Sequence, residues 1–406
     1  MKRSFFLQMQ NLAGAKRKFI LSIFLLILFI LSLTCGSRAF YDRLAQEDVL
    51  TDFVAYWSSA RLLLLSDNPY CSEHLQILQQ SVGWSQPDPL VMYNPPSTLT
   101  YILPFTAGNY VTSKFLWLVF ILGLTLWSAQ CLWYLYSGAK EKRHWPLILL
   151  ATFSPVYFML GKGQIIPIVL IGLVGFLYFQ EKRKDLLAGI SITTLITIKP
   201  HVAYLFCIIL LLWLTRERRW HILTGAFIGN FMFFFVPLFF NQNLLTQYWE
   251  AMLNQRGAYL WATPTIGTYL RFFWGGDKYW LQYLPMLFGI SWLFLHWLRR
   301  RSSWNWTQEM PMLLVISLMT NFYCWVNDYA LMIATTIHPV TLMAGNRINK
   351  ISLFLIGFYI FMNFIAFITY YNLNLSEHYF IWYPLFILVF HSIAAKNFAF
   401  SSTRIR

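Results

Sequence analysis

The chain has 406 residues, of which 58% are hydrophobic and only 12% are charged. Soluble domains carry roughly 25% charged residues, so this composition excludes a soluble globular class and predicts an integral membrane protein. The formal net charge of +15 would suit a nucleic-acid partner in a soluble protein. Here the basic residues lie in short clusters at every second gap between apolar runs, and this positive-inside pattern places both termini in the cytoplasm. No nucleic-acid partner is therefore expected.

The apolar runs predict an all-α integral membrane fold with about twelve transmembrane helices, because a span needs roughly 20 apolar residues. The first run has a basic front like a signal peptide, but it lacks a convincing cleavage site and is interpreted as an uncleaved first helix. The whole chain, 1–406, is expected to be one polytopic domain. The predicted spans are 19–36, 112–136, 146–160, 165–180, 186–198, 201–215, 221–240, 279–298, 310–324, 329–345, 351–370 and 379–395.

Two longer polar segments, 37–111 and 241–278, are predicted to be the first and second extracytoplasmic loops. Within the first loop, residues 47–65 have helical periodicity. Asp48, Asp52, Tyr56 and Ser59 line one side of this helix at positions i, i+4, i+8 and i+11, and apolar residues such as Phe53 occupy another side. The pattern predicts a helix that lies in the membrane interface with its apolar side buried and its carboxylates turned toward a cavity.

Ionisable side chains in or beside a membrane are costly, so each of them marks a candidate site. A carboxylate within hydrogen-bond reach of a hydroxyl can act as a general base, and an arginine or lysine can stabilise a leaving phosphate. Together they suit sugar transfer from a lipid phosphate to an alcohol. Asp48 and Asp52 are both candidate bases, and Asp48 could instead cap the helix. The other candidates on the outer half are Asp277, Asp328, Lys162, Lys199, Arg256 and Arg271, although Asp328 could instead pair with a basic residue.

Metal and cofactor chemistry finds little support in the sequence. The five cysteines contain no CxxC pair, and the eight histidines show no metal-ligand spacing. We therefore expect no cofactor and no metal, although carboxylates alone could hold a divalent ion.

Five stretches follow one another in a particular order: "DFVAYWSSARLLLLSDNPY", "YNPPSTLTYILPF", "GKGQIIPIVL", "AGISITTLITIKPHVAYLF" and "NFYCWVNDYALMIATTIHP". No single stretch is specific, but their order and spacing resemble glycosyltransferase family 87. The family consists of GT-C membrane enzymes that include polyprenol-phosphate-mannose-dependent mannosyltransferases. The resemblance extends over most of residues 47 to 340.

The resemblance implies a GT-C-like fold in the plasma membrane, a polyprenyl-phosphate donor of a sugar such as mannose, and a glycan or glycolipid acceptor outside the cytoplasm. It implies that Asp52 is the catalytic base and that the sugar is transferred by direct displacement with inversion. Lys199 maps onto a donor-phosphate or structural contact, and Tyr56, Tyr93 and Gln164 become candidate substrate contacts. Family members often carry a histidine beside the late acidic residue, where this chain has Asn327 beside Asp328; Asn327 is a further candidate substrate contact.

Three other function classes stay open. A transporter or lipid flippase commonly shows an internal repeat, and none is visible here. A sugar-polymer ligase or polymerase would be expected to have an arginine-rich late outer loop, whereas 241–278 contains two arginines. A scaffold without catalytic activity is the third alternative.

Overall fold

The computed structural model describes residues 50–254, 261–346 and 349–398. The chain forms two units, residues 1–49 and Leu50–Arg406, and all described residues belong to the second. In that part of the chain only helices, turns and loops occur, which confirms the all-α prediction. The predicted first span, 19–36, lies outside the described residues.

Six helical segments of the described chain are long and apolar enough to cross a membrane. Two further helical segments, 140–152 and 154–162, meet at a bend of 62°. They would form a seventh span if they cross the membrane together. The predicted number of about twelve spans therefore stays a prediction. The six are α5 (Tyr110–Leu135), Pro200–Glu217 with α10 (Tyr204–Glu217), α11 (His221–Phe240), Tyr279–Ser303 with α14 (Leu284–Arg300), α17 (Lys350–Tyr371) and Glu377–Phe398 with α18 (Trp382–Phe398).

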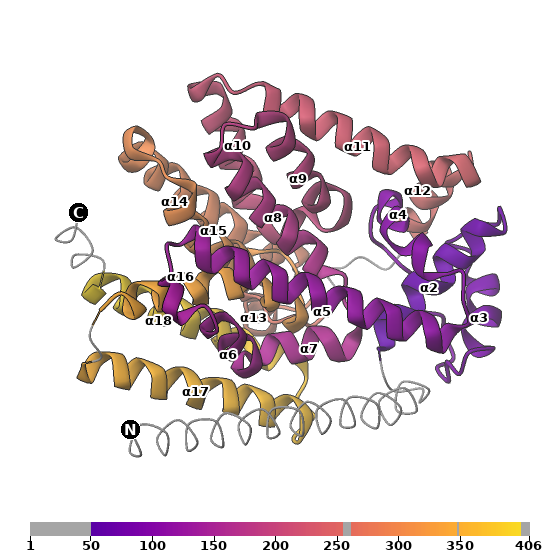
Figure 1. The fold of residues 1–406 in the computed structure, drawn as a ribbon. Coiled ribbons are helices and arrows are strands. Elements are labelled where there is room, and N and C mark those ends of the chain that lie inside the picture. Colours follow the sequence, from indigo (N-terminus) through magenta and orange to yellow (C-terminus); the bar gives the residue numbers. More distant parts are fainter. Residues whose placement is uncertain (1–49, 255–260, 347–348, 399–406) are drawn as a thin grey trace, which may run out of the picture. The chain divides into compact units, whose positions relative to one another are not determined.

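The other predicted apolar runs form shorter helices. They are α6 (Trp145–Thr152), α7 (Ser154–Lys162), α8 (Ile166–Glu181), α9 (Asp185–Ile198), α15 (Trp306–Thr320) and α16 (Ile333–Ala344). In Figure 1 helices α8, α9 and α10 lie in the upper part of the ribbon, and α11 packs beside α9. Glycine allows α9 and α11 to pack this closely, because a Cβ added to Gly189 would lie 2.0 Å from the backbone oxygen of Ile222. The two backbones therefore approach as closely as small residues allow in membrane helix pairs.

The predicted first extracytoplasmic loop contains α2 (Thr51–Leu64), α3 (Ser72–Gln80), η1 (Pro96–Thr98) and α4 (Leu99–Ile102). Helix α2 confirms the helix expected within 47–65, but its packing differs from the prediction. Phe53 on the predicted apolar side and Tyr56 and Ser59 on the predicted polar side are all buried, because α2 contacts α3, α4, α5, α7 and α11. The position of α2 at the membrane interface stays a prediction.

The predicted second extracytoplasmic loop contains α12 (Leu244–Asn254) and α13 (Ile266–Trp274). The late part of the chain adds η8 (Val326–Met332), which packs on α7 and α8, and η9 (Glu377–Ile381), which packs on α18. Helix η8 carries the late Asn-Asp pair of the sequence. Its contacts bring that pair to the junction between α7 and α8, where the candidate site lies.

Candidate functional site

Asp52 lies in the first turn of α2, at a point where this helix meets the end of α7. The residue before the helix, Leu50, has a left-handed backbone with φ 58°, and its N–H donates to the carbonyl of Gly161 at 3.0 Å. A carboxylate in the first turn is stabilised by the positive end of the helix dipole. The Asp52 side chain is half-buried, and its Oδ2 accepts a hydrogen bond from Nε2 of Gln164.

Gln164 reaches Asp52 because α7 ends in a tight left-handed turn. Gly163 has φ 70°, a conformation that glycine adopts at little cost. A Cβ at this position would lie 3.1 Å from Cβ of Phe53, so α2 also leaves little room for a side chain. The carbonyl of Gly163 accepts a hydrogen bond of 2.7 Å from Nε1 of Trp117. These contacts fix the turn and with it the direction of Gln164.

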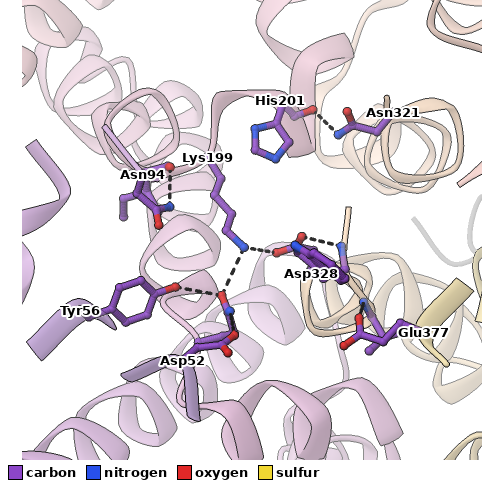
Figure 2. Close-up of polar contacts among 12 residues, drawn as sticks. Asp52, Tyr56, Asn94, Lys199, His201, Asn321, Asp328 and Glu377 are labelled. Carbon is purple, nitrogen blue, oxygen red and sulfur yellow. Dashed lines mark hydrogen bonds and ion pairs between the residues drawn. The ribbon is translucent and has the colours of Figure 1, made fainter. Parts of the chain in front are cut away.

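The Gln164 amide joins three candidate side chains, Asp52, Tyr56 and Lys199, all of which are labelled in Figure 2. Its Nε2 donates to Asp52, and its Oε1 accepts from the hydroxyl of Tyr56 at 3.1 Å and from Nζ of Lys199 at 3.2 Å. Burial raises the pKa of Tyr56 well above its ordinary value, and the charges of Asp52 and Asp328 raise it further. The Tyr56 hydroxyl therefore stays protonated and acts as a donor.

Lys199 lies at the end of α9, directly before Pro200, which disfavours continuation of the helix. Two carbonyl groups at the end of α9 accept hydrogen bonds from residues before α5. Asn94 Nδ2 donates to the carbonyl of Ile198 at 3.0 Å, and Thr98 Oγ1 donates to the carbonyl of Thr197 at 2.7 Å. The "YNPPST" stretch thereby holds the end of α9 in place. The Lys199 side chain is free to extend toward Gln164 and η8.

Asp328 forms an ion pair with Lys199, with 2.7 Å between Oδ1 and Nζ. Its other oxygen, Oδ2, accepts from the backbone N–H of Trp325 at 2.9 Å. The Asp328 side chain is fully buried and that of Lys199 is 9% exposed. The two groups thus compensate each other's charge in a region from which water is largely excluded.

A second ion pair beside this network joins the candidate Lys162 to Glu377, a residue that was not predicted from the sequence. Lys162, at the end of α7, pairs with Oε1 of Glu377 on η9, and Oε2 of Glu377 accepts from the N–H of Val326 at 3.1 Å. Glu377 therefore links the α7 turn to the start of η8. Its position in an outer gap between apolar runs is the one sequence signal that could have suggested it.

The remaining predicted site residues lie outside this network. Tyr93 is half-buried, with its ring 6.5 Å from that of Trp261. Asn327 is buried beside Asp328, and its Oδ1 has no partner among the described residues. Arg271 is buried on α13, where desolvation lowers its pKa, and two of its nitrogens, Nε and Nη1, lack partners in the same part of the chain. Asp48 and Arg256 fall outside the described residues.

The arrangement supplies a half-buried carboxylate, an amide that orients it, and a lysine next to both. Within residues 50–254, 261–346 and 349–398 no group of three His, Cys, Asp or Glu side chains is placed to hold a metal ion. A carboxylate and an ammonium group held this close suit proton transfer from a hydroxyl combined with stabilisation of a departing anion.

Comparison with known proteins identifies the family. The model of glycosyltransferase family 87 matches residues 92–321, which is more than half of the 406-residue chain. Neither curated proteins nor solved structures give a match. The matched region includes Gln164 and Lys199, and the network described above joins Asp52 and Asp328 to it. The chain belongs to glycosyltransferase family 87 and is a membrane glycosyltransferase.

Proposed function

We propose that the enzyme transfers a sugar, such as mannose, from a polyprenyl-phosphate donor to an acceptor hydroxyl on the extracytoplasmic side of the plasma membrane. The observation that supports this proposal is the meeting of Asp52, Gln164, Lys199 and Asp328, which come from four separate segments, in one hydrogen-bonded network. Such a network pairs a base with a cation at one position. Sugar transfer from a phosphate needs both groups.

Asp52 is the proposed general base. Gln164 holds its Oδ2, while Oδ1 lies 3.5 Å from Oγ1 of Thr51, a long contact that an acceptor hydroxyl can replace. The acceptor oxygen would attack the anomeric carbon as its proton passes to Asp52. The bond between that carbon and the phosphate oxygen would break, and polyprenyl phosphate would leave with the electron pair. This direct displacement inverts the configuration of the sugar.

Lys199 is the proposed contact for the leaving phosphate. An ammonium group has three N–H donors, and Gln164 and Asp328 accept two of them. The third N–H remains for a phosphate oxygen. Asp328 would keep the lysine charged and in position as a second carboxylate. Arg256 and Arg271 are proposed to add positive charge from the second outer loop, with Tyr93 and Asn327 as substrate contacts and Asp48 as a further carboxylate.

Transfer of radiolabelled sugar from polyprenyl-phosphate donors, measured in membranes, tests the proposal. We expect Asp52→Asn to lower the rate by about 100-fold or more, because a general base contributes about that much. Asp88→Asn is the matched control, since Asp88 is an exposed carboxylate in the same loop, and it should retain full activity. Asp48→Asn decides between the two candidate bases.

The proposed mechanism is wrong if Asp52→Asn protein inserts normally and transfers sugar at the wild-type rate. Substrate flux across sealed vesicles without any transfer product would favour the transporter alternative.

A further inference from the structure

A cavity of about 290 Å³ lies where three helices of the described chain end or begin. Gln180 and Glu181 belong to the last turn of α8, Glu217 is the last residue of α10, and Thr307 lies in the first turn of α15. Lys199 of the charged network precedes the other end of the 18-residue segment Pro200–Glu217, which is about 25 Å long. The cavity is therefore separate from the candidate active site.

The cavity lies where membrane-spanning helices reach the lipid headgroups. The segment Pro200–Glu217 ends at the cavity, and the segment Tyr279–Ser303 ends directly before Trp304, another lining residue. Both segments are long and apolar enough to cross a membrane, and tryptophan is enriched at the level of the headgroups. A lipid headgroup is thus the ligand with the highest local concentration around this cavity.

The charged side chains of the lining balance each other. They are two arginines and two glutamates, Arg183, Arg219, Glu181 and Glu217. The balance holds when their ion-pair partners are included, because Asp185 pairs with Arg219 and Arg216 Nε lies 3.7 Å from Oε1 of Glu217. A lining that carries both signs without an excess of either is complementary to a zwitterion rather than to a simple anion.

Arg219 brings a buried donor to this lining. Its side chain is 7% exposed, and its guanidinium group lies over the ring of Trp213, 5.1 Å from the ring centre. Nε and Nη2 donate to Asp185 and to the carbonyl of Gln180. Within the described chain no hydrogen bond engages Nη1, so two of the five N–H groups of the guanidinium remain for a phosphate oxygen in the cavity.

The lining favours a primary over a quaternary ammonium group as the positive end of the zwitterion. An ethanolamine ammonium has three N–H donors, which the carboxylates of Glu181 and Glu217 can accept. A choline group has no N–H and is recognised by several aromatic rings around it. Of the three lining tryptophans, Trp213 and Trp306 are only 6% and 2% exposed, so the half-buried Trp304 alone offers ring surface to a ligand.

Apolar surface continues from the cavity along the helices that border it. Tyr178 is 47% exposed and precedes Glu181 by three residues on α8, so the two share one side of that helix. On α10, Leu211 and Leu212 are 54% and 38% exposed before the helix reaches its end. Acyl chains need such apolar surface next to the headgroup, whereas a soluble phosphate compound does not.

We propose that this cavity binds the phosphoethanolamine headgroup of a membrane phospholipid. The phosphate accepts from Arg219 Nη1 and Arg183, the ammonium donates to Glu217 and Glu181, and the acyl chains lie along α8 and α10. The positive-inside pattern predicts that this lipid belongs to the cytoplasmic leaflet. The site is independent of the proposed sugar transfer, and its ligand joins the ends of α8 and α10 to the start of α15.

Titration of the delipidated full-length protein with phospholipids, followed by native mass spectrometry, tests the proposal. The probes are ethanolamine, choline and glycerol phospholipids with identical acyl chains. The first ethanolamine lipid should bind about fivefold more tightly than either of the others. Arg183→Gln should lower the affinity for the ethanolamine and choline lipids alike by about fivefold, which is the upper end for an exposed ion pair. Glu217→Gln should lower the affinity for the ethanolamine lipid only.

Arg218→Gln is the matched control. Arg183 and Arg218 are both exposed arginines that follow a helix with a left-handed backbone, at φ 55° and 54°, but Arg218 does not line the cavity. Its replacement should therefore leave the affinity unchanged. Equal affinities for the three lipids would overturn the proposal, and so would equal losses in Arg183→Gln and Arg218→Gln, since diffuse surface charge would then hold the lipid.

The source of the headgroup is tested with glycerophosphoethanolamine, which has the same phosphoethanolamine group and no acyl chains. It should bind about tenfold more weakly than the lipid or worse, because it buries no apolar chain against α8 and α10. Binding as tight as that of the lipid would identify a soluble ligand and refute the assignment to a phospholipid.

Discussion

The ion pair between Lys199 and Asp328 can be tested by a double-mutant cycle. Breaking a buried ion pair on one side costs about 3–5 kcal/mol, because the remaining charge stays in a low-dielectric interior. Lys199→Met keeps the apolar stem of the side chain and removes the charge. Among the described residues, Asp328 would then keep a single donor, the N–H of Trp325 at 2.9 Å. We expect a loss of about 3 kcal/mol in unfolding free energy, at the lower end of that range.

Asp328→Asn should cost a similar amount, since it leaves the Lys199 ammonium unpaired. The double variant carries no buried charge at this position, so it should be no less stable than either single variant, with a coupling energy of about 3 kcal/mol. Unfolding of the purified protein in mixed micelles, followed by fluorescence, measures all four corners of the cycle. The corresponding cycle at Lys162 and Glu377, which are 28% and 14% exposed, should give a smaller coupling of about 1 kcal/mol. Additive losses at Lys199 and Asp328 would refute the reasoning.

Three further substitutions test the site and the fold. Gln164→Leu removes the donor that orients Asp52, so kcat for sugar transfer should fall about 100-fold at normal expression; an unchanged kcat would remove Gln164 from the mechanism. Tyr56→Phe deletes one hydrogen bond to Gln164 and should cost about 1 kcal/mol in unfolding free energy, with kcat reduced tenfold at most. Gly189→Ala should destabilise the protein by about 3 kcal/mol or more, because the added Cβ would overlap the backbone of α11. Gly123→Ala is the control: no atom lies within 4 Å of the added Cβ, so the thermal midpoint of unfolding should stay unchanged.

Helical spacing was enough to predict which residues of α2 act together. Asp52 and Tyr56 are four residues apart, so they share a side of any helix formed there, and in the structure both interact with Gln164. The same sequence reading gave Lys199 and Asp328 as separate candidates. Pairing with a basic residue was one interpretation of Asp328, but its partner could not be identified, because Lys199 is 129 positions away and periodicity describes neighbours within one helix only.

The burial of α2 shows a second limit of sequence reasoning. An apolar side chain that faces lipid and one that faces another helix have the same composition, so the hydrophobic pattern does not separate them. Ser59 appeared to belong to a polar side exposed to a cavity. In the structure it is buried, and its hydroxyl donates to the carbonyl of Pro69 at 3.0 Å. The turn after α2 thereby folds back onto the helix that precedes it.

The charges of the site suggest how the two outer loops divide the proposed reaction. The described network and its neighbouring pair contain three carboxylates, Asp52, Asp328 and Glu377, and two ammonium groups, Lys162 and Lys199. This set carries one net negative charge, and a donor phosphate would add another in a poorly solvated place. Further positive charge must therefore accompany the donor. The second outer loop contains both Arg256 and Arg271, so in the proposed mechanism this loop neutralises the phosphate while the first loop activates the acceptor.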